Sequence, residues 1–248
     1  MKISTVTVSF NSQATIARAI ESFLEQTHPD KEMLVIDGAS KDGTLDVVRS
    51  FASGAIRVIS EKDRGIYDAM NKGLRYFSGD AIGFLNSDDA YHDNSVLARI
   101  THALDNADAV HGDLVMVKDH VGRRAVRTWR AGPFVPGSFR HGWMPPHPTF
   151  YIRRDLAAAM GAFDLSYGTS ADYDFMLRTL ELHAPRTAYI PHPLIDFMVG
   201  GVSTKGLRAV IDGNLECLRS RRAHLGARRV DLALFTKPAR KLLQLHWR

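Results

Sequence analysis

Residues 3–85 alternate between short apolar runs and stretches in which apolar residues recur at helical spacing. The short runs predict strands, and the amphipathic stretches predict helices. The expected strands are residues 3–10, 33–36, 56–59 and 81–85, and the expected helices are residues 16–24, 45–51 and 65–73. Strands that are joined by crossover helices run parallel to one another. The alternation therefore predicts an α/β fold, with a doubly wound, mostly parallel sheet that carries helices on both faces.

The expected strand at residues 81–85 ends at a polar loop that contains two adjacent carboxylates, Asp88 and Asp89. Ligands of open α/β sheets bind at this end of the strands. Two neighbouring carboxylates that lose solvation repel each other, so they need a compensating cation. Because oxygen ligands suit Mg²⁺ and Mn²⁺, the pair predicts a site whose metal is shared with substrate phosphates. A solvated turn, the ordinary use of Asp and Ser in loops, is the alternative.

Other polar residues follow the neighbouring strands. Asn11 and Ser12 end the first expected strand and have the composition of a helix N-cap, and Asp37 ends the second strand. Arg64 comes just before the helix that is expected to begin near Gly65. The N-terminus of that helix would face the same end of the sheet as Asp37, because both follow parallel strands. A helix N-terminus beside a guanidinium predicts an anion site.

Five stretches occur in the order in which one enzyme family carries them. They are Val6–Asn11, Val35–Thr44, Gly65–Gly73, Phe84–Asp89, and Gly161–Asp164 together with Ser170–Arg178. On these motifs the chain resembles the family-two glycosyltransferases of the GT-A fold, over residues 3–203. The resemblance implies a nucleotide-diphosphate sugar as donor, Mn²⁺ or Mg²⁺ as cofactor, and transfer with inversion at the anomeric carbon. It also implies a saccharide or lipid-linked acceptor, in the assembly of a bacterial-type surface polysaccharide.

The resemblance carries over to the expected donor site residue by residue. Asp37, with the backbone around Ser9-Phe10-Asn11, is implied to hold the nucleoside, and Arg64 is a candidate for the diphosphate. Family members often carry a second Asp where this chain has Gly38, so one nucleoside contact is either absent or supplied elsewhere.

The metal motif also departs from the family. Asp89 aligns with the main metal ligand, and Asp88 aligns with a residue near the ribose or the metal. The family's motif often begins with Asp, but here that position is Asn86, which cannot supply a charge. Asp88 and Asp89 therefore remain as the ionic pair.

The family's catalytic base lies in an acidic dipeptide, which falls on Ala171-Asp172 in this chain. The first acid is missing and the second remains, so the resemblance favours Asp172 as the base. Asp172 opens an expected amphipathic helix, and a helix N-terminus would keep its carboxylate ionised. Helix capping alone is the alternative role for Asp172, and Asp174 is the rival candidate for the base.

Three further features leave two interpretations each. His147 either contacts phosphate, metal or acceptor, or is a hydrogen-bonded structural histidine. The segment 123–140, rich in Arg and aromatic residues, is either an acceptor-binding loop or a surface excursion. The Gly200-Gly201 pair lies in a segment that resembles the loop closing the family's catalytic domain, and it suits a mobile or closely approaching backbone.

The basic residues gather near the C-terminus. Residues 205–248 contain eleven Lys or Arg and three Asp or Glu, a net charge of +8, which leaves −3 for residues 1–204. We expect residues 1–204 to form the catalytic domain and residues 205–248 a basic helical extension. From Pro238 onward, apolar and basic residues alternate at helical spacing up to Trp247, which favours contact with an anionic membrane surface. A domain-docking or oligomer helix is the alternative.

The remaining features limit the cellular location and the class of function that the chain can have. No apolar run approaches the ~20 residues of a membrane-spanning helix, and the single cysteine fits a reducing compartment. We expect a cytoplasmic protein, peripheral on the inner face of the cell membrane.

A catalytically inactive nucleotide-sugar sensor is the rival suggested by Asn86 and Ala171. Nucleic acid is not expected as a partner, because no recognition motif accompanies the basic tail. A dinucleotide oxidoreductase is disfavoured because no glycine-rich fingerprint follows the first strand.

Overall fold

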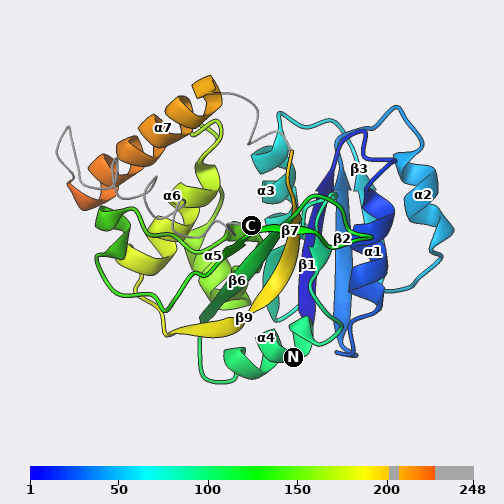
Figure 1. Cartoon of the computed structure of the whole chain (residues 1–248), viewed down its shortest axis with the longest axis horizontal. Helices are drawn as coiled ribbons and strands as arrows, with labels where there is room; N and C mark the ends of the chain where they lie inside the picture. The colour runs from blue at the N-terminus through cyan, green and yellow to red at the C-terminus, as the bar shows by residue number, and fades with distance from the viewer. Residues whose placement is uncertain (201–206, 227–248) are drawn as a thin grey trace.

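The computed structural model describes residues 1–200 and 207–226, without the side chains of residues 207–210. Within these ranges nine strands form one sheet in the order β3-β2-β1-β4-β8-β6-β9-β5, and β7 pairs with β6 beside this path. The strands are β1 (Ile3–Ser9), β2 (Lys31–Asp37), β3 (Ile56–Ser60), β4 (Ala81–Phe84), β5 (Ala90–Tyr91), β6 (Ala109–Val117), β7 (Ala125–Trp129), β8 (Tyr151–Arg153) and β9 (Thr187–Met198). Helices flank the sheet (Figure 1).

The first half of the sheet is parallel, as the alternation predicts. β1 pairs in parallel with β2 and β4, and β2 pairs in parallel with β3. The register places Ser9 opposite Asp37, and Asp37 opposite Ser60. The carboxyl ends of these strands therefore bring three polar side chains to one edge of the sheet.

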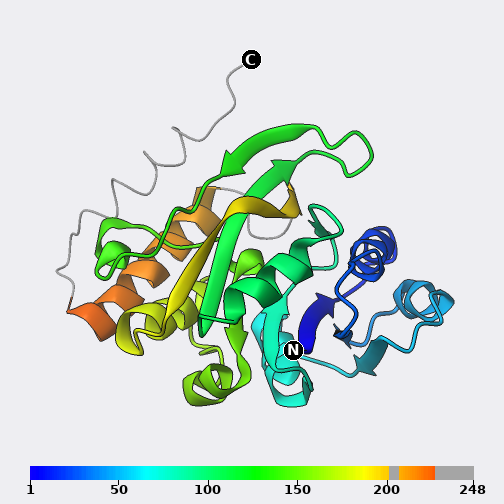
Figure 2. The ribbon, with the colours of Figure 1, turned by 90° about the horizontal axis from the view of Figure 1, so that it is seen from below.

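The second half of the sheet is mixed. β8 is antiparallel to both β4 and β6, and β6 runs parallel to β9. β5 is antiparallel to β9, and β7 is antiparallel to β6. The hairpin formed by β6 and β7 projects from the sheet (Figure 2). The expectation of a mostly parallel α/β sheet is confirmed, with the antiparallel pairs confined to this half.

Helices cover both faces of the sheet, as expected. The helices are α1 (Ile16–Leu24), α2 (Thr44–Ser50), α3 (Ile66–Tyr76), α4 (Val96–Leu104), α5 (Arg154–Met160), α6 (Ala171–Leu177) and α7 (Leu207–Leu225), with short turns η1 (Ser138–His141), η2 (His147–Thr149) and the π-helical η3 (Arg178–Leu182). α1, α2 and α4 share one core cluster with Met33 and Val35, whereas α3, α5 and α6 share the other with Leu34 and Ile36. The two-residue alternation of β2 thus fills two separate cores.

Two glycines allow close packing against the strands. A Cβ at Gly73 would lie 2.4 Å from a Val6 methyl group, so glycine lets α3 approach β1. A Cβ at Gly83 would lie 2.3 Å from the Tyr151 ring. Gly73 lies near the end of its helix, as expected, in the last turn of α3, which continues to Tyr76.

The first helix of the basic extension, α7, packs against α6 (Figure 1). Ser220 donates a hydrogen bond to Asp174 at 2.8 Å, and the buried Arg221 guanidinium donates to the Tyr173 hydroxyl at 3.0 Å. Leu218 is buried, whereas Ile211 and Leu215 are about half exposed. The predicted amphipathic segment from Pro238 to Trp247 lies outside the described residues.

No helix in the described part of the chain is both long enough and apolar enough to span a membrane.

Candidate active site

Asp37 is the centre of a hydrogen-bonded cluster at the carboxyl ends of β1, β2 and β3. Its buried carboxylate accepts hydrogen bonds from the hydroxyls of Ser60 at 2.7 Å, Ser9 at 3.3 Å and Ser40 at 2.5 Å, and from the Ser40 N–H at 3.0 Å. Burial alone would raise the pKa of Asp37, but the bonds from Ser40, Ser60 and Ser9 outweigh it and hold the pKa below its usual value. The structure thus fixes an ionised carboxylate at this edge.

The residues after β1 form a loop against the one that follows β2. Asn11 has a φ of 50°, its N–H donates to the Ser40 hydroxyl at 2.8 Å, and its side-chain oxygen accepts the Lys41 N–H at 2.9 Å. The expectation that Asn11-Ser12 caps the first helix is wrong, because α1 begins at Ile16 and Asn11 joins the two loops instead. Phe10 turns outward and is 64% exposed, so its ring is open to a ligand at the sheet edge.

Asp63 occupies the space that a side chain at position 38 would fill. A Cβ at Gly38 would lie 2.6 Å from Asp63 Oδ2 and 3.3 Å from the Phe10 ring. The other Asp63 oxygen accepts the Gly65 N–H at 2.9 Å. Sequence reasoning missed this carboxylate, although Asp63 is the neighbour of Arg64 and the absent acid at position 38 left one nucleoside contact to be supplied elsewhere.

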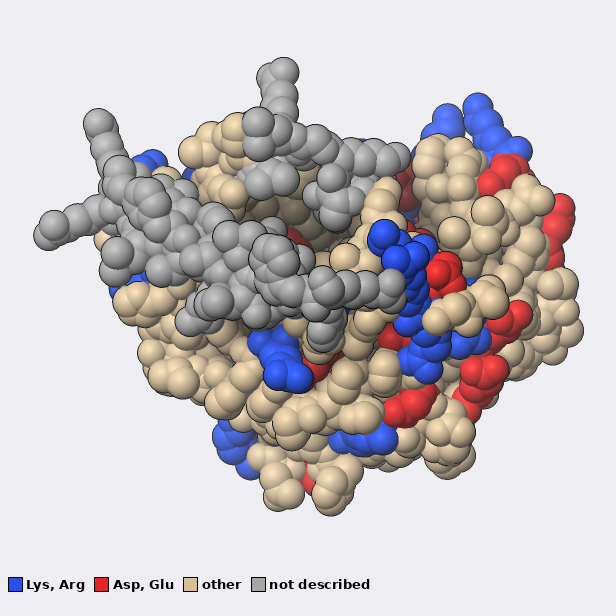
Figure 3. Space-filling model, in the orientation of Figure 1, with Lys and Arg blue, Asp and Glu red and all other residues tan. Residues whose placement is uncertain are grey.

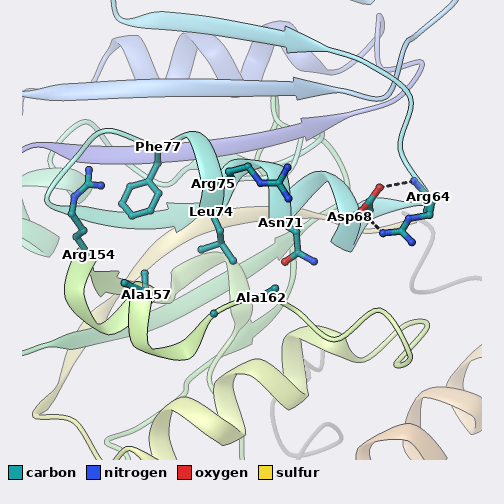
Figure 4. A pocket seen from close by; sticks show the side chains of 11 residues that line it. Arg64, Asp68, Asn71, Leu74, Arg75, Phe77, Arg154, Ala157 and Ala162 are labelled. Atoms are coloured by element: carbon teal, nitrogen blue, oxygen red, sulfur yellow. Dashed lines mark hydrogen bonds and ion pairs between the residues drawn. The ribbon is translucent and has the colours of Figure 1, made fainter.

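Arg64 lies just before α3 and is largely exposed. Its guanidinium and its backbone N–H both bond Asp68, at 3.1 and 3.0 Å, and these bonds hold the pKa of Asp68 below its usual value. Arg64 lies at one end of a groove of about 450 Å³ between α3 and α5, and Arg154 packs over the Phe77 ring at the other end (Figure 4). The groove is lined by Arg64, Asp68, Asn71, Leu74, Arg75, Phe77, Arg154, Ala157, Ala158, Gly161 and Ala162.

Asp88 and Asp89 follow β4, as expected, but their environments differ. Asp89 is fully buried, and its carboxylate accepts the Met198 N–H at 2.9 Å and the Asn86 amide at 2.8 Å. It is therefore not an exposed loop residue whose removal would leave the fold intact. The Asp88 side chain is half-buried, and no other described residue donates a hydrogen bond to its carboxylate. His120, in the β6–β7 hairpin, bonds the Asp88 backbone carbonyl at 2.8 Å.

The two carboxylates together fit a hard divalent cation. Burial raises the pKa of Asp88, and burial with the Asp88 charge raises the pKa of Asp89 well above its usual value. A bound cation would relieve this repulsion. Among the described residues no group of three His, Cys, Asp or Glu side chains is placed to hold a metal. A metal here would therefore take part of its coordination shell from substrate phosphate and water.

Asp172 lies in the first turn of α6, after Ser170 at the N-cap position. Its side chain is half-buried, and Oδ1 accepts the Tyr67 hydroxyl at 3.1 Å and the Tyr173 N–H at 2.8 Å. Tyr67 belongs to α3, beside Arg64, so this bond brings α6 to the expected donor site.

Asp174, the rival candidate, is turned into the protein. It is 1% exposed, and its carboxylate bonds Arg178 at 2.8 Å, Ser220 at 2.8 Å and His224 at 3.0 Å. Its hydrogen bonds fasten α7 to α6, which leaves Asp174 poorly placed to receive a proton from a ligand.

His147 lies between the metal motif and α6. It is 8% exposed, stacks on Phe84 with ring centroids 5.2 Å apart, and meets Phe163 edge-on at 5.8 Å. Burial lowers the pKa of His147, while the negative charge of Asp172 acts in the opposite direction. No described residue hydrogen-bonds its ring, so the second interpretation of His147, a hydrogen-bonded structural histidine, does not hold within the described residues.

The remaining sequence features lie around this site. Gly200 has a φ of 108°, and Gly201 lies outside the described residues. Within the segment 123–140, Arg123 forms an ion pair with Asp196 at 2.8 Å, and Phe139 is buried against Trp143. In Figure 3 acidic and basic side chains are interspersed on the described surface near the first half of the sheet.

Solved structures share this fold. S. aureus TarS residues 1–349 in complex with UDP is similar with a TM-score of 0.68 and 18% sequence identity, covering 94% of this chain and 68% of that one. A mannosyltransferase from Pyrobaculum calidifontis in complex with GDP-Man and Mn²⁺ has a TM-score of 0.67 and 18% identity, covering 96% of this chain and 68% of that one. At these identities the similarity concerns the fold alone.

Curated relatives match more closely in sequence. An uncharacterized glycosyltransferase of Mycobacterium tuberculosis is 32% identical over 239 residues, which cover 93% of this chain and 88% of the relative. The PGL/p-HBAD biosynthesis glycosyltransferase of Mycobacterium bovis is 29% identical over 193 residues, 75% of this chain and 73% of the relative. A UDP-Glc:alpha-D-GlcNAc-diphosphoundecaprenol beta-1,3-glucosyltransferase of Escherichia coli is 36% identical over 105 residues, 42% of each chain.

The sequence profile of glycosyl transferase family 2 matches residues 4–164, a span that contains Asp37, Arg64, Asp88 and Asp89. This match covers more than half of the chain, and it agrees with the fold and with the curated relatives. The chain therefore belongs to glycosyl transferase family 2.

Proposed function

We propose that this glycosyltransferase moves a sugar, with inversion, from a nucleotide-diphosphate sugar to a saccharide or lipid-linked acceptor in surface polysaccharide biosynthesis. The observation that carries the proposal is the placement of three carboxylate groups around one edge of the sheet: Asp37, the pair Asp88 and Asp89, and Asp172. The pair and Asp172 are linked, because Phe84 of the metal motif stacks on His147, whose pKa responds to the charge of Asp172.

The nucleoside would bind at the ends of β1 and β2. Asp37 supplies an ionised acceptor that three serine hydroxyls hold in place, and the exposed Phe10 ring offers a flat apolar face for the base. Ser9 and Asn11 act here by holding Asp37 and the adjoining loop. Asp63, which fills the space above Gly38, is a further candidate for a nucleoside contact.

The diphosphate would lie between Arg64 and the Asp88–Asp89 pair. Arg64 can form charge-assisted hydrogen bonds to phosphate oxygens. Asp88 and Asp89 would hold Mn²⁺ or Mg²⁺, which as a Lewis acid stabilises negative charge on a departing nucleoside diphosphate. The Mn²⁺ in the similar mannosyltransferase structure supports this cofactor.

Asp172 would act as the general base. The acceptor hydroxyl attacks the anomeric carbon from the face opposite the diphosphate, its oxygen forms the new glycosidic bond, and its proton passes to the Asp172 carboxylate. The bond from the anomeric carbon to the diphosphate oxygen breaks, and the nucleoside diphosphate leaves with the electron pair. Because Asp174 is held by Arg178, Ser220 and His224, Asp172 is the better-placed acid on α6.

We further propose that residues 205–248 bring the enzyme to an anionic membrane on the cytoplasmic side. A catalytic part of net charge −3 would be repelled by such a surface, whereas the extension carries +8. Each Lys or Arg near the surface contributes about 1 kcal/mol. The diphosphoundecaprenol-linked acceptor named for the E. coli relative supports a substrate at the membrane.

A panel of nucleotide-diphosphate sugars tests the proposal. UDP-Glc, UDP-GlcNAc and GDP-Man are screened for a thermal shift with and without Mn²⁺, and the donor that binds is then offered to acceptors while nucleoside diphosphate release is followed. We expect one donor to stabilise the protein only with Mn²⁺ and to yield a product of inverted anomeric configuration. Binding without turnover on any acceptor would favour the sensor that Asn86 and Ala171 suggest. Binding of none would overturn the donor assignment.

A further inference from the structure

A hydrogen bond from Tyr67 joins the helix at the donor site to the helix that carries Asp172. The Tyr67 hydroxyl lies 3.1 Å from Asp172 Oδ1 and 2.9 Å from the Thr169 carbonyl oxygen. Tyr67 belongs to the first turn of α3, whereas Asp172 belongs to the first turn of α6. The bond therefore fixes the position of one helix start relative to the other.

The bond also distinguishes the two oxygens of the Asp172 carboxylate. Oδ1 accepts the Tyr67 hydroxyl and the Tyr173 N–H at 2.8 Å. No described residue hydrogen-bonds Oδ2, so within the described part of the chain this oxygen is open to a ligand. A carboxylate that is held through one oxygen presents the other in a fixed direction, which a proton transfer requires.

Tyr67 itself is held as a neutral donor. Its ring packs on Phe163 with centroids 5.8 Å apart. Burial, and then the negative charge of Asp172, raise the pKa of Tyr67, so the phenol keeps its proton throughout the working range of an enzyme.

The second acceptor of the Tyr67 hydroxyl, the Thr169 carbonyl oxygen, is held in position by a residue of α7. Glu216 accepts hydrogen bonds from the Thr169 N–H at 2.9 Å, the Thr169 hydroxyl at 3.1 Å and the Gly168 N–H at 2.8 Å. The Thr169 carbonyl is thus held within reach of Tyr67. The single phenol proton has two acceptors, and an ionised Asp172 attracts it more strongly than a neutral carbonyl does.

We propose that Tyr67 is the positioning residue for Asp172, which it orients through Oδ1 so that Oδ2 faces the acceptor hydroxyl. This inference rests on the proposed function. When Oδ2 takes the hydroxyl proton as the glycosidic bond forms, Asp172 becomes neutral and the phenol proton can turn to the Thr169 carbonyl. Tyr67 donates a hydrogen bond throughout and exchanges no proton with the substrate.

Other charged or titratable groups surround this pair on each neighbouring element. The charge of Asp172 acts on His147 of η2, whose pKa is lowered by burial, and the charge of Glu216 of α7 acts on Tyr67. On α6 itself, Asp174 is paired with Arg178 and with His224 of α7. Removing the Tyr67 hydroxyl changes none of these groups, so a change in pH dependence can be assigned to the lost bond.

The test compares Tyr67→Phe with a matched control. Tyr189→Phe removes another tyrosine-to-carboxylate bond, from the Tyr189 hydroxyl to Asp113 at 2.7 Å, on β9 and β6. We expect Tyr67→Phe to keep the donor affinity and the donor KM, to lose about tenfold in kcat, and to move the acidic limb of the kcat profile about one pH unit upward. Tyr189→Phe should keep the wild-type kcat profile.

A second replacement tests the direction of the effect. With 3-fluorotyrosine at position 67, the phenol is a more acidic donor of nearly the same size, so the acidic limb should move to lower pH. This measurement also covers the case in which Tyr67→Phe fails to fold, as judged by its thermal unfolding. A wild-type kcat profile for both Tyr67 replacements would overturn the inference.

Asp172→Asn, measured in parallel, separates the two claims. If Asp172→Asn loses turnover while Tyr67→Phe behaves as wild type, Asp172 remains the proposed base and the positioning role proposed for Tyr67 is wrong. If Asp172→Asn keeps turnover, the proposed base is wrong and the role of Tyr67 falls with it.

Discussion

The Asp89 carboxylate, just after β4, accepts a hydrogen bond at 2.9 Å from the backbone N–H of Met198, the last residue of β9. Asp89 therefore has two roles: it accepts structural hydrogen bonds, and it belongs to the pair that fits a cation. Asp88, whose carboxylate no other described residue bonds, has only the proposed cation-binding role. The two neighbours should consequently respond differently to substitution.

Asp88→Asn should abolish metal-dependent nucleotide binding and leave the free energy of unfolding within about 0.5 kcal/mol of wild type, because the Asp88 carboxylate bonds no other described residue. Asp89→Ala should also lose metal-dependent binding, but it leaves the Met198 N–H and the Asn86 amide without their acceptor. We expect it to cost about 1–3 kcal/mol of stability. Denaturant unfolding, and calorimetry of nucleoside diphosphate with Mn²⁺, measure both effects. Unchanged Mn²⁺-dependent affinity in both variants would remove the pair from the metal site.

The two acids of α6 offer a matched pair. Asp172→Asn keeps the shape of the side chain but cannot take up the acceptor proton, so turnover should drop by roughly 10²–10⁴-fold while donor binding persists. Asp174→Asn weakens the ionic contacts to Arg178 and His224, so its main effect should be a lower thermal midpoint. Near-normal turnover in Asp172→Asn, together with loss of turnover in a folded Asp174→Asn, would transfer the base to Asp174.

Gly38→Ala tests whether the Asp63 carboxylate serves the nucleoside. The added methyl group would lie 2.6 Å from Asp63 Oδ2 and displace that carboxylate. We expect Gly38→Ala and Asp63→Ala to weaken nucleotide binding by similar factors, and the double variant to lose no more than either one. Gly54→Ala is the control, since a Cβ there meets no atom within 4 Å. Additive losses in the double variant would mean that the two positions act separately.

The lowered pKa of Asp37 predicts how stability depends on pH. The folded protein holds this carboxylate ionised below the usual value of 3.8, so its bonds from Ser9, Ser40 and Ser60 stabilise the fold above that pH. The contribution is lost as the pH falls from 3.8 through the lower folded pKa. Asp37→Asn should therefore differ most in stability from wild type above pH 3.8, with the difference shrinking on further acidification. Denaturant unfolding across acidic pH checks this; a difference that does not depend on pH would contradict it.

Two truncations separate the membrane role of the extension from its role in the fold. Removal of residues 227–248 leaves α7 in place, so donor hydrolysis should survive while binding to anionic vesicles is lost. High salt should weaken vesicle binding of the full-length protein without abolishing it, because screening acts on the charges and not on a buried apolar face. Removal from residue 207 also takes away Glu216, Ser220 and Arg221, so it should lower the thermal midpoint. Vesicle sedimentation that is unchanged in the shorter truncation would overturn the membrane assignment.

The first half of the fold could be predicted because its pattern is local. In β1 and β2 the two-residue alternation is dictated by burial on two faces, and each crossover helix lies next to its strands in the chain. The second half could not be ordered in this way. β8 has only three residues and lies between β4 and β6, and nothing within Tyr151–Arg153 specifies two antiparallel partners.

The residues of the candidate site were likewise only partly predictable from the sequence. Asp37, Asp88 and Asp89 stand out in the sequence because carboxylates at the ends of apolar runs are unusual. The family motifs mark these three residues and Asp172 as well. Tyr67 and Asp63 do not stand out, because their roles depend on side chains far away in the chain or on an empty volume. The burial of Asp89 was missed for the same reason, since its partner Met198 is 109 positions distant.

The unequal halves of the sheet also have a consequence for the order of folding. Strands β1, β2 and β3 pair across only 28 and 23 positions of the chain, from Ile3 to Lys31 and from Met33 to Ile56. β9 must find β6 across roughly 80 residues, and loop-closure entropy delays such pairing. We infer that strands β1, β2 and β3, which carry the proposed nucleoside site, assemble first and that the backbone N–H of Met198 reaches Asp89 late. An early intermediate would then recognise the base and the ribose but not coordinate the cation. Pulsed hydrogen exchange during refolding should protect the amides of β1 and β2 before those of β9, and simultaneous protection of both would refute this order.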